Sequence, residues 1–131
     1  MMLQGGCHCG AVRYEMSDEV THHSLCHCRD CRVCAGAPVV SWAAVRCEAL
    51  KVKGEVQTYR SSEDAVRSFC GRCGTGLFYV NEAVLPGLVD VQTATLDDPG
   101  ALPVQLHVQV ADRIGWMTTA HELPEFERYP G

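Results

Sequence analysis

The 131-residue sequence predicts one mainly β domain, in which small antiparallel sheets are joined by short helical turns. Short runs rich in β-branched and apolar residues alternate with Gly, Asp, Ser or Pro at short intervals, which is typical of strands and turns. No segment has the apolar periodicity of an amphipathic helix of three turns. The length suits a single hydrophobic core, so we expect the domain to span 1–131.

Eight segments have the length and composition of strands, namely 11–16, 37–45, 49–54, 56–60, 65–70, 76–80, 88–96 and 104–110. In 104–110, four aliphatic residues alternate with three polar ones, so the two kinds of side chain are expected on opposite faces. The best helical candidate is one or two turns within 29–35. The segment 96–102, with Asp98 before Pro99, predicts a turn.

Charge and hydropathy exclude several function classes. The formal net charge is −5 and Lys and Arg are scattered, which argues against a nucleic-acid-binding surface. No run of eighteen apolar residues is present, so no membrane span is expected. The first residues lack a basic segment followed by an apolar one, so we expect no secretory signal and a cytoplasmic protein.

Nine cysteines are the most informative feature of the composition. In a reducing compartment such a number favours metal binding or catalysis over disulfides. Seven of the cysteines form three tight groups along the chain, namely Cys7 with Cys9, Cys26 with Cys28 and Cys31, and Cys70 with Cys73.

The first and last groups predict one closed metal site. Cys7 and Cys9 are flanked by glycines, and Cys70 and Cys73 lie in a Gly-rich Cys-x-x-Cys-Gly turn. Such turns let two sulfurs converge while backbone N–H groups point at them, and glycine tolerates the positive φ they require. Two half-sites would make a tetrahedral four-thiolate zinc site with a structural role. The alternative is two disulfides, of which a Cys7–Cys9 bridge would be strained.

The middle group predicts a different kind of site. Three sulfurs spaced as Cys26, Cys28 and Cys31 can cap one face of a zinc ion and leave a fourth position open, as in catalytic zinc sites. Three thiolates leave such a centre negatively charged, so it is a weaker Lewis acid than a histidine site. It suits a soft ligand, such as a substrate thiol that ionises on coordination.

Four motifs occur in this order along the chain: GGCHCGAVRY, CHCRDCR followed by GAPVVSW, FCGRCGTGLFY and VDVQTATLDDP. Together they resemble the motifs of the glutathione-dependent formaldehyde-activating enzyme family, whose relatives include centromere protein V. The resemblance covers roughly 5–120. It implies a β-tent of small sheets, similar to that of methionine sulfoxide reductase B and of a zinc-binding chaperone of Rab GTPases. It also implies two zinc ions: a structural one on Cys7, Cys9, Cys70 and Cys73, and a catalytic one on Cys26, Cys28 and Cys31.

The activity that the resemblance implies is that of a carbon–sulfur lyase, which forms or cleaves an S-hydroxymethyl adduct of a thiol and an aldehyde. The small-molecule partner would be such a thiol or adduct, for example glutathione, although no residue set in the sequence identifies a glutathione pocket. Two other hypotheses are a non-catalytic zinc-stabilised binding module and a thiol-redox protein. The redox protein would need a reactive cysteine outside the metal sites, which leaves only Cys34 or Cys47.

Cys34 has three interpretations: a buried small apolar residue, a fourth ligand that closes the middle site, or the partner of Cys31 in a reversible disulfide. Cys47 is expected to fill core or surface space. His27 could serve as a proton donor or an alternative ligand, but we favour a ring that points away from the metal, because neighbours of strand-like ligands face the opposite side. We expect one of the adjacent His22 and His23 to be exposed and His107 to be solvated. Trp42 and Trp116 are expected in the core or in a pocket wall.

Overall fold

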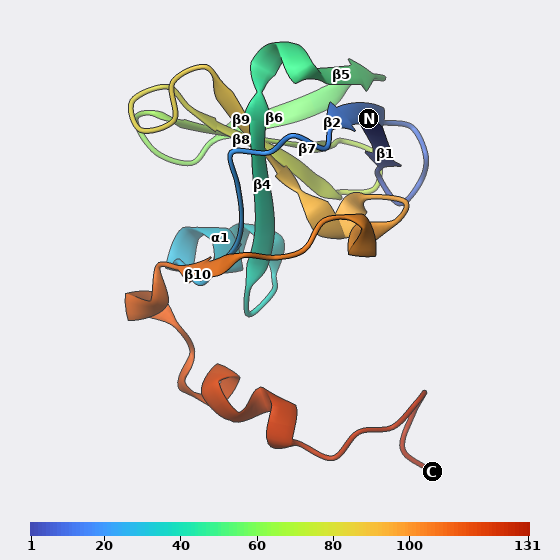
Figure 1. Ribbon diagram of the computed structural model, residues 1–131, viewed down its shortest axis with the longest axis vertical. Coiled ribbons are helices and arrows are strands. Elements are labelled where there is room, and N and C mark those ends of the chain that lie inside the picture. Colours follow the sequence, from blue (N-terminus) through green and yellow to red (C-terminus); the bar gives the residue numbers. More distant parts are fainter.

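The structure, a computed structural model, describes all residues 1–131 and is mainly β, as predicted (Figure 1). The strands are β1 (Met2–Gly6), β2 (Arg13–Ser17), β3 (His22–Cys26), β4 (Val40–Arg46), β5 (Leu50–Lys53), β6 (Val56–Arg60), β7 (Ala65–Cys70), β8 (Gly76–Asn81), β9 (Leu88–Gln92) and β10 (Leu106–Val108). The one α-helix is α1 (Arg29–Ala35), as predicted. Five 3-10 helices are η1 (Cys47–Ala49), η2 (Thr93–Thr95), η3 (Pro99–Ala101), η4 (Val110–Asp112) and η5 (Gly115–Glu122).

The strands form two sheets. A three-stranded sheet has the order β1-β2-β5, and a seven-stranded sheet has the order β10-β3-β4-β9-β8-β7-β6. Every pair of neighbouring strands is antiparallel except β10 and β3, which run parallel. The prediction of antiparallel sheets is therefore wrong at this edge, where the chain returns from η3 to lie beside β3.

The main core joins the two sheets. Tyr14 from β2 lies in one cluster of 12 buried residues with Val45 from β4 and Val91 from β9. On β9 the alternation is complete: Val89 and Val91 belong to this core, so Asp90 between them points to the opposite face of the large sheet. That second face carries the candidate site.

Several predicted strands differ from the observed ones. The predictions for 56–60 and 65–70 coincide with β6 and β7, whereas 104–110 shortens to the three residues of β10. There Val104, Leu106 and Val110 are exposed, and the left-handed Gln109 (φ 57°) ends the strand. The segment 88–96 leaves the sheet at Gln92 and continues as η2, and the predicted turn at 96–102 contains η3.

The strands β1 and β3 were not predicted. Two of the five residues of β1 are glycines, and β3 has the sequence HHSLC, which lacks the β-branched residues that mark a strand. The buried His23 explains the position of β3. Its Nδ1 lies 3.1 Å from the Pro103 carbonyl oxygen, and its Nε2 lies 2.8 Å from Thr93 Oγ1. Hydrogen bonds thus compensate for the burial of a polar strand.

The C-terminal segment, with η5 and the residues after it, runs away from the two sheets (Figure 1). Trp116 in η5 is 59% exposed, so it does not belong to the core; it lines a surface hollow with Pro38 and Ile114, which is the pocket-wall alternative of the prediction. Trp42 is buried, as expected. None of the helices combines the length and apolar character that crossing a membrane requires.

Candidate metal centres and their cavity

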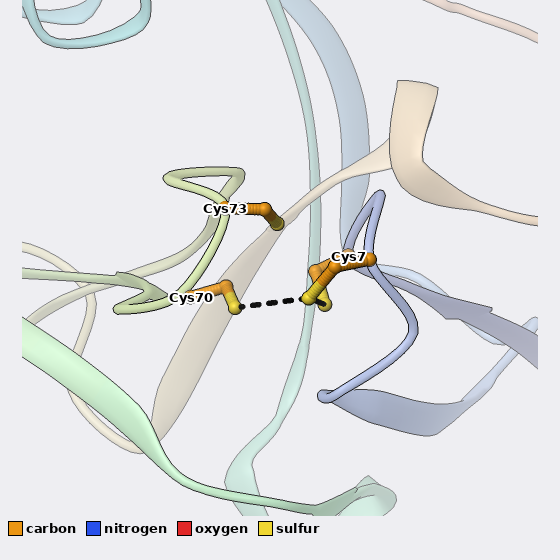
Figure 2. Close-up of side chains that lie close together, drawn as sticks. Cys7, Cys70 and Cys73 are labelled. Atoms are coloured by element: carbon orange, nitrogen blue, oxygen red, sulfur yellow. Dashed lines mark hydrogen bonds between the residues drawn. The ribbon is translucent and has the colours of Figure 1, made fainter.

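The first and last cysteine groups meet in space, as the spacing predicts. Cys7 and Cys9 lie in the turn between β1 and β2, while Cys70 ends β7 and Cys73 lies in the turn before β8. Their four Sγ atoms are all within 4.8 Å of one another, with 3.7 Å between Cys7 and Cys9 and 3.8 Å between Cys9 and Cys70. Figure 2 shows Cys7, Cys70 and Cys73 converging from the two turns.

These distances fit a zinc ion. A tetrahedral site with Zn–S bonds of about 2.3 Å has sulfur–sulfur edges of about 3.8 Å. The glycines that follow each pair, Gly10 and Gly74, adopt φ values of 83° and 81°, so both turns use the positive φ that the sequence predicted. The backbone N–H of Val12 donates to Cys7 Sγ at 3.2 Å and that of Arg72 donates to Cys70 Sγ at 3.4 Å. Four thiols and their donors therefore could hold a metal ion with no coordination position left over.

The middle group forms the second centre. Cys26 ends β3, Cys28 is the N-cap of α1 and Cys31 lies in its first turn, and the three Sγ atoms are within 4.8 Å of one another. The Cys31 N–H donates to Cys28 Sγ at 3.2 Å, so the cap that starts the helix also orients the sulfur. Gly36, with φ 64°, ends the helix. The fold thus brings together the three thiols that the sequence grouped.

The surroundings of one of these thiols favour its ionised form. Hydrogen bonds from Cys26 and Cys28, together with the Arg67 guanidinium, lower the pKa of Cys31 to about 5. The hydrogen bond with Cys31, together with burial, raises the pKa of Cys26. The Nη atoms of Arg67 lie 3.8 and 3.7 Å from Cys31 Sγ, and its guanidinium lies over the Tyr79 ring at 4.8 Å from the centroid. Arg67 therefore places a fixed positive charge beside the three thiols.

The three-thiol group opens into a cavity of about 600 Å³ on the face of the large sheet away from the core. A single row of paired residues crosses five strands of this sheet: His22 pairs with Ala44, Ala44 with Asp90, Asp90 with Tyr79, and Tyr79 with Arg67. Directly paired residues project from the same face, so the polar members of the row line the cavity floor. Walls come from Trp42 on β4 and from the β10 region, which contributes Leu106, Val108 and Gln109.

Asp90 is the unusual residue of this floor. It is 6% exposed, its Oδ1 accepts no hydrogen bond, and the nearest basic group is His22 Nε2 at 3.5 Å. Burial raises the pKa of Asp90 to about 6. Sequence analysis missed Asp90 and Arg67 as site residues; a signal was present for Asp90, a charged residue between two valines in an apolar run.

Cys34 is exposed, so the interpretation as a buried apolar residue is wrong. Its sulfur is not part of the three-thiol group, so it does not complete a fourth position here, and all nine cysteines are free thiols. Cys34 lines a neighbouring cavity that also includes Trp42 and Arg67. Cys47 is exposed in η1.

The histidines next to the cysteines lie outside both thiol groups. His27 is buried and its Nε2 lies 2.9 Å from Nδ1 of the exposed His107, so its ring points away from the thiols, as favoured from the sequence. His8 is exposed, and its backbone N–H donates to Thr75 Oγ1. Of the adjacent pair, His23 is buried and the His22 side chain is 31% exposed.

Comparisons with known proteins show which family this chain resembles. The model of the family described as glutathione-dependent formaldehyde-activating enzyme matches residues 2–112. A putative glutathione-dependent formaldehyde-activating enzyme of Halomonas elongata is 32% identical over 130 residues, which cover 89% of this chain and 80% of that protein. An uncharacterized lyase of Schizosaccharomyces pombe is 32% identical over 76 residues, 58% of this chain and 56% of that protein, so the chain matches only about half of the yeast relative.

The fold is also found in a solved structure. The crystal structure of a Rhodobacter sphaeroides protein superposes with a TM-score of 0.61 at 26% identity, and covers 79% of this chain and all of that chain. The family match spans both cysteine clusters and the strands that form the cavity floor. The chain therefore belongs to the glutathione-dependent formaldehyde-activating enzyme family.

Proposed function

We propose that this protein is a zinc-dependent carbon–sulfur lyase that forms or cleaves the adduct of a small thiol and an aldehyde. The observation that carries the proposal is the difference between the two cysteine clusters. The four thiols of one cluster fit a closed tetrahedral site, whereas the other has three thiols and faces a cavity. A metal centre that keeps one position open beside a cavity can bind a substrate.

Two zinc ions fit the donor sets, and the two sites would have different roles. The ion held by Cys7, Cys9, Cys70 and Cys73 would tie the β1–β2 turn to the β7–β8 turn and stabilise 1–131 as one domain. The ion held by Cys26, Cys28 and Cys31 would supply an open position that favours the ionised form of a substrate thiol. Because three thiolates carry more negative charge than one zinc ion compensates, Arg67 beside Cys31 would offset the excess.

The cavity limits the class of substrate. Its volume of about 600 Å³ is in the range of small-molecule sites. Trp42 and Tyr79, whose ring centroids are 5.8 Å apart, form an apolar wall, while Arg67 and His22 add positive or ionisable groups. This combination favours a small thiol with polar or acidic substituents. The family description makes glutathione with formaldehyde the first pair to test.

The test compares a serine substitution in each cluster. Cys28→Ser should leave a folded protein that has lost one zinc ion and the exchange between formaldehyde, glutathione and S-hydroxymethylglutathione, followed by exchange NMR. Cys70→Ser should lose the other ion and unfold at a much lower temperature, because a closed zinc site contributes on the order of 10 kcal/mol to folding. Cys47→Ser, which changes an exposed thiol outside both clusters, is the matched control.

Equal loss of stability in Cys28→Ser and Cys70→Ser would contradict the division between a structural and a reactive site. Full exchange activity in a folded Cys28→Ser protein would contradict the proposed function.

A further inference from the structure

We infer that Asp90, positioned by His22, is the group that transfers the proton between sulfur and oxygen in the thiol–aldehyde reaction. This inference rests on the proposed function and adds to it a residue that the cysteine motifs do not contain.

The register fixes where the carboxylate points. Val89 and Val91 are buried in the main core, so Asp90 must project from the other face of β9 into the cavity. His22 lies two strands away in the same row, separated only by Ala44, whose small side chain leaves room for the histidine to reach the carboxylate. The resulting separation of His22 Nε2 and Asp90 Oδ1 is 3.5 Å.

A structural carboxylate would have its oxygens satisfied. Buried polar atoms are almost always hydrogen-bonded, and an unpartnered buried carboxylate is costly. The Asp90 side chain is only 9% exposed, yet Oδ1 accepts no hydrogen bond. The free acceptor faces a cavity that the three thiols also line, so the missing donor is best supplied by a ligand there.

The other ionisable groups around Asp90 are already engaged. Tyr79 from β8 accepts a hydrogen bond from Asn81 Nδ2, and Arg67 from β7 contacts Cys31 on α1. At the cavity mouth, Asp30 of α1 lies 3.8 Å from Arg29. His22 from β3 and the Cys31 thiol on α1 are the other ionisable groups that act on the carboxylate, and the 31% exposure of His22 connects the pair to solvent. Asp90 is therefore the carboxylate of the cavity floor, and its Oδ1 has no hydrogen-bond donor.

The proton balance needs only one such group. The substrate thiol passes its S–H proton to Asp90 Oδ1 when it ionises, and the electron pair of the resulting thiolate then forms the C–S bond with the aldehyde carbon. The C=O π pair moves to the oxygen, which then takes the proton back from Asp90 to become the hydroxyl. The carboxylate is restored, and cleavage of the adduct is the reverse. A pKa raised by burial to about 6 suits a group that both accepts and donates near neutral pH.

The experiment uses glutathione and formaldehyde as probes with the zinc-loaded protein. In Asp90→Asn we expect kcat for S-hydroxymethylglutathione exchange to fall about 100-fold or more, with KM for glutathione within threefold of the wild type and the zinc content unchanged. Asp64→Asn removes the same charge from an exposed turn and is the control. His22→Gln should displace the pH optimum of kcat and leave KM unchanged.

Chemical rescue separates chemistry from packing. In Asp90→Ala, added formate should restore part of the lost kcat, because a free carboxylate can enter the cavity, whereas a structural role would not be rescued. Asp90→Asn with kcat within threefold of the wild type would overturn this inference and leave the proposed function standing. A loss of kcat in Asp90→Ala that added formate does not restore would also overturn this inference. A wild-type protein that holds two zinc ions and gives no exchange above the buffer rate would overturn the proposed function itself, and this role with it.

Discussion

The burial of Asp90 predicts that the wild-type side chain destabilises the fold at neutral pH. Burial raises the pKa of Asp90 from 3.8 to about 6, so the folded protein holds the proton more tightly than the unfolded chain. The free energy of unfolding therefore falls as the pH rises between these two values. The difference of about two pH units, at about 1.36 kcal/mol each, gives a cost of about 3 kcal/mol above pH 7.

Asp90→Asn removes the titration and leaves the side chain uncharged at every pH. About half of the cost develops between pH 5 and pH 7.5. The stability of Asp90→Asn relative to the wild type should therefore increase by about 1–2 kcal/mol across this range. Because both proteins keep the same cysteines, the pH dependence of metal binding cancels in the difference.

Urea unfolding at pH 5, 6 and 7.5, with zinc in excess, measures this difference, and Asp64→Asn supplies the baseline for an exposed carboxylate. A difference between Asp90→Asn and the wild type that is constant with pH, or that decreases as the pH rises, would refute the reasoning. The expected gain also matters for activity, since a variant that is more stable at neutral pH cannot have lost turnover through unfolding.

Three further predictions concern the scaffold. Gly54→Val should destabilise the protein by at least about 2 kcal/mol in urea unfolding. The reason is that Gly54 has φ 99° and that a Cβ there would clash with the Ala11 carbonyl oxygen. Gly36→Ala should cost less, because nothing lies within 4 Å of the added Cβ. Leu77→Ala should cost about 2–5 kcal/mol because Leu77 is fully buried, and a cost below 1 kcal/mol would show that the site collapses around the smaller side chain. An excess of a zinc chelator should remove both ions and lower the melting temperature sharply; an unchanged melting temperature after complete removal would contradict a structural site.

The two cysteine clusters could be predicted because much of what determines them is local. Each half of the four-thiol site is a short cysteine pair followed by a glycine, and those glycines, Gly10 and Gly74, adopt the positive φ that such turns need. The helix within 29–35 was likewise predicted, and Cys28 caps it with its own sulfur. Neighbouring residues determine the geometry of each turn and of the helix, so the sequence carries the signal for each of them, whereas the contact between the two cysteine pairs is long-range.

The cavity floor could not be predicted in the same way. His22 and Asp90 are brought together by the register of β3, β4 and β9, and register depends on long-range pairing. The strand β3 was itself missed, because the contacts of His23 with residues of the β9–β10 connection hold it in place and these partners are 70 or more residues away. Apolar periodicity in 104–110 was misleading, because a peripheral strand leaves one aliphatic face exposed.

The parallel pairing of β10 with β3 also has a consequence for synthesis on the ribosome. All seven cysteines of the two clusters precede residue 74, whereas β10, which closes one side of the cavity, ends at Val108. At about 5–20 residues per second, the roughly 35 residues between Cys73 and Val108 take about 2–7 s to be added. For those seconds a nascent chain already carries both sets of thiols without the strand that covers the three-thiol group, so metal ions and oxidants compete for the same uncovered sulfurs.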